Sequence, residues 1–141
     1  MALALAMTAD EISGFLDAEF PEMHDGGQVF FVDRVDPGQV VVRFTAGPKH
    51  LRPGGTISGP AQFALADICA YVAVLAHVGP VALAVTTGVT INFLRKPAPG
   101  DLIATARILK RGRRLVVVDC GITGAGSSEL VAHAVATYSV P

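Results

Sequence analysis

A mainly apolar stretch between residues 60 and 76 dominates the pattern of the chain and contains one charged side chain, Asp67. Its apolar residues occur on every side of a helix, which is typical of a buried helix rather than of a surface helix. Gly59 and Pro60 predict where this helix begins, because a proline in the first helical turn gives up only an N–H group that the helix leaves unpaired. An ionised carboxylate is costly to bury unless it is paired or hydrogen-bonded, so Asp67 is a candidate functional residue.

Before the apolar helix, the pattern predicts a short helix and a hairpin. Thr8 is a good first residue for a helix whose apolar residues follow at helical spacing, and Pro21 is expected to end this helix. Residues 28–35 read as one strand and residues 39–46 alternate as a second strand, with the turn Asp36-Pro37-Gly38 between them. This pattern predicts two antiparallel strands.

After Gly79-Pro80 ends the apolar helix, the remaining residues predict only strands. Four apolar segments are separated by short breaks: residues 82–94, 101–110, 113–123 and 129–140. Connections as short as these favour antiparallel pairing. The predicted fold class is therefore α+β, with one long central helix wrapped by a roughly six-stranded antiparallel sheet.

The length of 141 residues and the 51% hydrophobic content predict a single domain with a sizeable core. We expect residues 1–20 to form an N-terminal helical segment and residues 21–141 to form the body of the fold. The charged fraction of 16% is low for so small a surface, which indicates that another subunit covers part of it. Cys69 and Cys120 do not make a disulfide framework, and the histidines show no metal-ligand spacing, so no metal site is predicted.

Charge is divided unevenly along the chain. Up to Asp36 there are eight acidic residues and one basic residue, whereas the remainder has ten basic and four acidic residues. A cationic body suits an anionic ligand. Nucleic acid is not expected as a partner, because few aromatic residues and no recognition motif accompany the basic ones. The apolar helix is expected to fall short of the roughly 20 apolar residues of a membrane span, so a cytoplasmic protein without a membrane partner is predicted.

Two stretches of the sequence resemble a known family. Residues 55–71 contain a glycine-rich turn followed by Leu65-Ala66-Asp67, and residues 86–102 contain a strand, a loop and the pair Gly100-Asp101. Both stretches are similar to hot-dog-fold thioesterases, and more closely to the phenylacetate-pathway (PaaI-like) type of acyl-CoA thioesterase.

This resemblance implies a hot-dog fold and the hydrolysis of an acyl-CoA, aryl or aliphatic, to a free acid and coenzyme A. It implies no cofactor, since coenzyme A is part of the substrate. It also implies a homodimer, or a dimer of dimers, in which each site lies at the interface between two subunits.

The resemblance further implies roles for three residues. Asp67 falls on the family's catalytic carboxylate, which acts as nucleophile or general base, and Gly59 falls on the glycine whose backbone N–H binds the thioester carbonyl oxygen. Thr86 falls where relatives carry a serine or threonine that helps to position water. The role of Gly59 is also sound on physical grounds, since a free N–H group at the positive end of a helix dipole stabilises a developing oxyanion.

Two positions depart from the family's pattern. Ser58 stands where the family has a histidine, and Arg52 stands where it has an asparagine. We keep both as candidate substrate-binding residues, although Ser58 also fits the simpler role of a helix N-cap.

Further substrate-binding candidates follow from the chemistry of an acyl-CoA. Phe63 and Tyr71 of the apolar helix, of one or other subunit, are expected beside the acyl chain. Arg95 and Lys96 are candidates for the phosphates of coenzyme A, because arginine in particular binds phosphate in a bidentate manner. A second basic cluster, between residues 110 and 114, is the weaker candidate for the same role.

Two other functions stay open at this point. His50 lies nine residues before Gly59, the spacing at which hot-dog dehydratases of the acyl-carrier-protein class carry a histidine, so His50 is a candidate site residue of a hydratase or dehydratase. The glutamate that those enzymes place five residues after the glycine is missing, because position 64 is alanine. The second alternative is a non-catalytic acyl-CoA binding module, in which Ser58 and Arg52 mark a site that binds without turnover.

Overall fold

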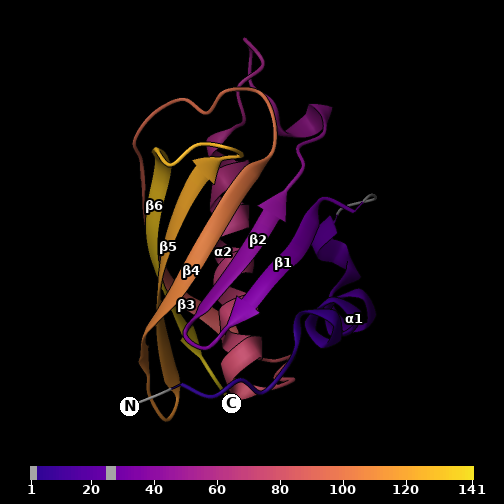
Figure 1. Cartoon of the computed structure of the whole chain (residues 1–141), viewed down its shortest axis with the longest axis vertical. Coiled ribbons are helices and arrows are strands. Elements are labelled where there is room, and N and C mark those ends of the chain that lie inside the picture. The colour runs from indigo at the N-terminus through magenta and orange to yellow at the C-terminus, as the bar shows by residue number, and fades with distance from the viewer. Residues whose placement is uncertain (1–2, 25–27) are drawn as a thin grey trace.

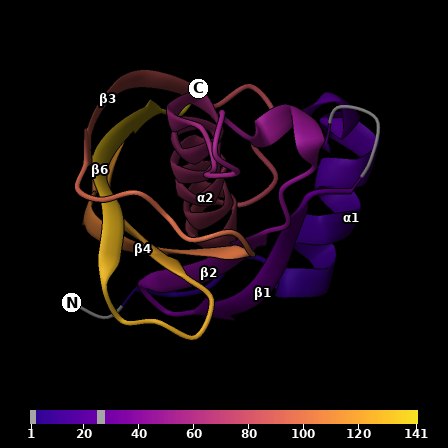
Figure 2. The same ribbon diagram turned by 90° about the horizontal axis from the view of Figure 1, so that it is seen from above.

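Helix α2 (Gly59–Val78) runs through the middle of the molecule, and the sheet curves around it (Figures 1 and 2). The structure is a computed structural model that describes residues 3–24 and 28–141. Ser58 caps the helix, because its hydroxyl accepts a hydrogen bond of 3.3 Å from the Ala61 N–H. The helix ends at Gly79, whose φ of 116° lies in the left-handed region that favours glycine. The predicted start and end of the helix are thus confirmed.

The apolar helix meets the length and hydropathy expected of a membrane span. Its 20 residues are long and apolar enough to cross a membrane, so the expectation that it falls short of a span is wrong. However, 78% of its most apolar window is buried inside the fold. A helix that is apolar on all sides and enclosed by its own protein has the pattern of a core helix. The cytoplasmic location stays a prediction.

The sheet consists of six antiparallel strands in the order β1-β2-β4-β5-β6-β3. Strand β3 follows α2 in the chain but pairs with β6, so it lies at one edge of the sheet, and β1 lies at the other. The predicted fold class, with one long helix wrapped by six antiparallel strands, is confirmed. The bounds of the strands are β1 (Phe30–Asp36), β2 (Gln39–Phe44), β3 (Val85–Phe93), β4 (Leu102–Arg111), β5 (Leu115–Gly124) and β6 (Leu130–Ser139).

The core lies between α2 and the concave face of the sheet. In β4, Leu102, Ala104 and Ala106 are fully buried, while the residues between them are partly buried, so one face of the strand is turned to the helix. Cys69 and Cys120 are both buried in this core as free thiols, and burial raises the pKa of the Cys69 thiol.

The N-terminal helix α1 (Ala9–Glu19) packs against β1 and α2. Thr8 and Glu11 form a capping box, in which each side chain accepts a hydrogen bond from the other residue's backbone N–H. The sequence analysis missed two short 3₁₀ helices, Pro21–His24 and Pro48–His50. Because the first of these begins at Pro21, the α-helix ends before this proline as predicted, but a short 3₁₀ helix follows it. The division at residue 20 stays a prediction.

Candidate active site

Asp67 lies in the middle of α2 and faces β3 and β6. Its Oδ1 accepts two hydrogen bonds of 2.7 Å, one from the Thr86 hydroxyl and one from the Tyr138 hydroxyl. The Tyr138 hydroxyl also lies 3.0 Å from the backbone carbonyl oxygen of Asp67. The Asp67 side chain is half-buried, so these two donors replace part of the water that an exposed carboxylate would bind.

A β-bulge in β3 turns Thr86 toward the helix. Further along β3, Val89 and Ile91 pack against the core, so alternate residues face inward. Continued alternation would place Thr87 on the inner face. Instead, the pairing with β6 shifts between Thr86 and Gly88, which places Thr86 opposite Tyr138. Bulges re-aim side chains in this way. The local irregularity of β3 therefore brings the Thr86 hydroxyl to Asp67.

Tyr138 is a buried residue of β6, and its ring is held in a stack. The ring centroids of Tyr138 and Tyr71 are 5.8 Å apart, and their planes differ by 15°. Burial, and then the negative charge of Asp67, raise the pKa of Tyr138 far above its usual value. Burial, and then the charge of Glu19, also raise the pKa of Tyr71. Both phenols therefore keep their protons at neutral pH and act as hydrogen-bond donors.

A pocket of about 360 Å³ lies against Asp67. Its walls come from the end of α1, from α2, from the segment between α2 and β3, and from the facing ends of β3 and β6. The aromatic rings on these walls make the pocket partly apolar, while the carboxylate and hydroxyls give it a polar side. We call it the Asp67 pocket, and it is lined by Glu19, Phe20, Asp67, Tyr71, Ala82, Ala84, Val85, Thr86 and Tyr138.

A second pocket, also of about 360 Å³, lies at the start of α2. We call it the Gly59 pocket. Gly59 and Asp67 are eight residues apart on one helix, which separates them by about 12 Å at 1.5 Å per residue. The two predicted catalytic residues of one chain therefore do not meet. The Gly59 pocket is lined by Arg52, Thr56, Ile57, Gly59, Gln62, Phe93, Leu94, Arg95, Lys96 and Pro97.

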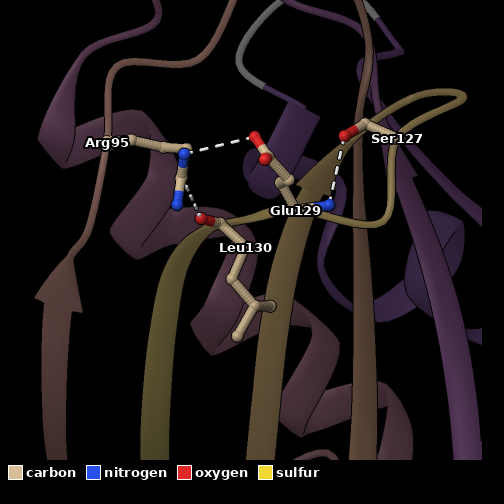
Figure 3. A network of polar contacts seen from close by, with 4 residues as sticks. All are labelled: Arg95, Ser127, Glu129 and Leu130. Atoms are coloured by element: carbon tan, nitrogen blue, oxygen red, sulfur yellow. Dashed lines mark hydrogen bonds and ion pairs between the residues drawn. The ribbon is translucent and has the colours of Figure 1, made fainter.

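The Gly59 pocket contains three of the predicted cationic residues, Arg52, Arg95 and Lys96. Figure 3 shows that Arg95 reaches from the segment after β3 to the start of β6. Its Nε donates to the backbone carbonyl oxygen of Leu130 at 3.1 Å, and its guanidinium lies 3.2 Å from the Glu129 carboxylate. Both partners of this ion pair are more than half exposed, so the pair contributes little to stability.

Three other predicted site residues lie outside both pockets. His50 accepts a hydrogen bond of 2.8 Å from the Gly47 N–H, and its ring packs edge-on against Phe44. Phe63 is exposed on α2. Ser58 serves as the N-cap described above, so its hydroxyl is engaged by the helix. Of the residues predicted for the acyl chain, the structure thus places only Tyr71 beside Asp67.

The basic residues of the β4–β5 hairpin, between 110 and 114, are also away from both pockets. Within the part of the chain that the structure describes, no group of three or more His, Cys, Asp or Glu side chains is placed to hold a metal ion.

Sequence reasoning missed Tyr138, Phe20 and Glu19. Tyr138 lies in a predicted strand, but strand periodicity does not reveal which residue it faces across the sheet. Phe20 contacts Tyr71 edge-on, with ring centroids 6.2 Å apart. The docking of α1 against α2 brings Phe20 and Glu19 to the pocket, and no local sequence signal predicts that docking.

The long helix, the wrapped sheet and the carboxylate site define a hot-dog-fold protein. The chain matches the thioesterase superfamily over residues 54–130. This range includes helix α2, which lines both pockets, and the bulge in β3 beside Thr86. The protein therefore belongs to the thioesterase superfamily.

Solved structures agree with this assignment. A crystal structure of a "putative thioesterase" from Silicibacter sp. TM1040 is 43% identical, with a TM-score of 0.89 over 99% of this chain and 95% of that one. The PaaI protein of the E. coli phenylacetic acid degradation operon is 25% identical, with a TM-score of 0.70 over 91% of each chain. The resemblance to PaaI-like thioesterases is confirmed.

A third structure contains a ligand. The protein smu.793 from Streptococcus mutans, solved bound to acetyl CoA, is 27% identical, with a TM-score of 0.70 over 81% of this chain and 90% of that one.

Proposed function

We propose that this protein is a thioester hydrolase that converts an acyl-CoA to a free acid and coenzyme A. The observation that carries the proposal is the half-buried carboxylate of Asp67, which faces a pocket and is held by two hydroxyl groups. A carboxylate held in this way can attack the thioester carbonyl carbon, or it can take a proton from an attacking water. The family and the acetyl CoA bound in the Streptococcus mutans structure support the choice of substrate.

The complete site needs a second copy of the chain. Strand β3 is an edge strand, and the apolar residues Val85 and Phe93 at its two ends are more than half exposed. Its start lines the Asp67 pocket, and its end lines the Gly59 pocket. If two copies pair antiparallel along β3, the start of one strand lies beside the end of the other. We therefore propose a homodimer, alone or within a dimer of dimers, in which the Asp67 pocket adjoins Gly59 of the partner subunit.

In this dimer the chemistry is divided between two chains. The N–H of Gly59 of the partner subunit lies at a helix N-terminus and polarises the thioester carbonyl, where negative charge develops. Asp67 attacks the carbonyl carbon or activates water. The Thr86 hydroxyl donates a hydrogen bond to Asp67, and its oxygen can still accept a hydrogen bond from the water.

The two pockets also suggest how the substrate is divided. The Asp67 pocket has aromatic walls that suit an acyl group, with Tyr71 as one wall. The Gly59 pocket is lined by Arg52, Arg95 and Lys96, which suit the phosphates of coenzyme A. His50 lies in neither pocket, which favours hydrolysis over the dehydration reaction that would require it.

The first test is a thiol-release assay with short, medium, long and aryl acyl-CoAs. We expect Asp67→Asn to lower kcat by about 100-fold or more, because a positioned acid–base group typically contributes 10²- to 10⁴-fold. Asp119→Asn is the matched control, since Asp119 is partly buried and pairs with His133 away from both pockets. If the natural protein releases thiol from no member of the panel, the proposal fails, and binding without turnover becomes the better account.

A further inference from the structure

The two carboxylate oxygens of Asp67 have different surroundings. Oδ1 accepts hydrogen bonds from both Thr86 and Tyr138. Oδ2 has no hydrogen-bond partner among the residues that the structure describes. Because the side chain is only half-buried and lines the pocket, the carboxylate is held at one oxygen and presents the other.

We propose that Tyr138 is a positioning residue for the reaction: with Thr86 it anchors Oδ1 of Asp67, so that Oδ2 is the oxygen that attacks the carbonyl or takes the proton from water. This inference rests on the proposed thioesterase function. It assigns a task to a residue that no motif of the sequence identified.

Two contacts give Tyr138 control over the orientation of Asp67. Its hydroxyl lies 2.7 Å from Oδ1 and 3.0 Å from the backbone carbonyl oxygen of the same residue. One donor shared between a side-chain atom and a main-chain atom ties the carboxylate to its own backbone. It thereby restricts rotation about the side-chain bonds of Asp67, whereas Thr86 alone would hold Oδ1 from one direction.

The hydroxyl can only donate in this arrangement. An ionised carboxylate and a backbone carbonyl are both acceptors. Burial and the charge of Asp67 hold the pKa of Tyr138 far above its usual value, so the phenol keeps its proton throughout the pH range of an ordinary assay. Tyr138 therefore acts as a constant anchor and not as an acid or base in the reaction.

The anchor is itself rigid. Strand β6 lies between β5 and β3, and Tyr138 pairs with Val116 on one side and with Thr86 on the other. The stack on Tyr71 fixes its ring from the side of the helix. A functional group held by packed neighbours keeps its geometry without an entropic cost at the moment of reaction.

The test is the Tyr138→Phe variant, which keeps the ring and removes only the hydroxyl. A misplacement of about 1 Å can cost on the order of 10²-fold in rate, so we expect kcat to fall by about 10- to 100-fold while KM changes less than about two-fold. Thr105→Val is the matched control, because it removes a hydroxyl from β4 that lies in neither the Asp67 pocket nor the Gly59 pocket. Its kcat should stay within about two-fold of the natural protein's.

A double-mutant cycle separates positioning from general damage to the fold. If Tyr138 acts through Asp67, adding Tyr138→Phe to Asp67→Asn should cause no further loss of the residual activity. The positioning role would be contradicted if Tyr138→Phe lowered kcat by the same factor in the natural protein and in Asp67→Asn. It would also be contradicted if Asp67→Asn inactivated the enzyme while Tyr138→Phe alone kept kcat within two-fold of the natural value. A natural protein without thiol release would overturn the proposed function itself, and this inference with it. Thermal unfolding of each variant shows whether it is folded in the assay.

Discussion

The Asp67 pocket and the Gly59 pocket are built on the same helix and the same edge strand, but they differ in how much one chain completes. At the Asp67 pocket, Thr86 and Tyr138 already hold the carboxylate. At the Gly59 pocket, the helix N-terminus and three cationic residues surround a space whose lining, among the described residues, includes no carboxylate. In the dimer that we propose, the two pockets are halves of one site, and within one chain they are kept apart by the eight helical residues between Gly59 and Asp67.

The largest effect that this comparison predicts comes from the Gly59 N–H. Gly59→Pro removes that N–H, and proline is well tolerated at the first helical position. We expect kcat to fall by roughly 100- to 1000-fold, the loss typical of one oxyanion donor. Gly59→Ala is the control, because it keeps the N–H and its added Cβ would lie 3.5 Å from the Phe93 ring, an ordinary contact. Similar losses in both variants would point to a steric effect and against the oxyanion role.

The next prediction concerns the division of the site between two chains. Asp67→Asn and Gly59→Pro homodimers should each be inactive, but a dimer with one chain of each kind contains one site in which both residues are intact. After unfolding and refolding of an equal mixture, half of the dimers are mixed and each has one of two sites intact, so we expect about a quarter of the natural activity.

Measured thiol release from the refolded mixture, compared with each variant refolded alone, is the readout. A mixture that stays as inactive as its components would show that both residues must belong to one chain. That result would contradict the β3-paired arrangement while leaving the role of each residue intact.

Much of the scaffold could be predicted from the sequence, and the reasons are local. The all-round apolar pattern of residues 60–76 has few structural solutions other than a core helix, and Ser58, Pro60 and Gly79 mark its ends. The short connections after residue 100 leave little choice but antiparallel pairing. The bounds of the strands were predicted less well. Strand β3 begins at Val85, three residues after the predicted start at residue 82.

The site could be predicted only in part, because its remaining contacts are non-local. Asp67 is evident as the one charge in an apolar helix. The Thr86 contact depends on a bulge in β3, and the Tyr138 contact depends on the register of β6, which the pairing of the whole sheet sets. Phe63 and Tyr71 looked equivalent on the helix, but only Tyr71 faces the pocket, since the sheet and α1 determine which side of α2 is enclosed.

The smallest predicted effect distinguishes the two pockets without any substrate. Because Tyr138 has a raised pKa in the folded protein, the unfolded chain loses this proton first as the pH rises above the ordinary tyrosine value of about 10. The folded state then binds the proton that the unfolded state has released, so the stabilisation is fully present below pH 10 and declines above it. The decline should approach about 1.4 kcal/mol per pH unit for one such group.

Denaturant unfolding of the natural protein and of Tyr138→Phe between pH 8 and pH 11 tests this prediction. The difference between their free energies of unfolding at each pH cancels the titration of the other groups. Parallel pH dependence in the two proteins would mean that the Tyr138 hydroxyl is not held as the structure shows, and Gly59→Ala should leave this dependence unchanged because the Gly59 pocket contains no tyrosine.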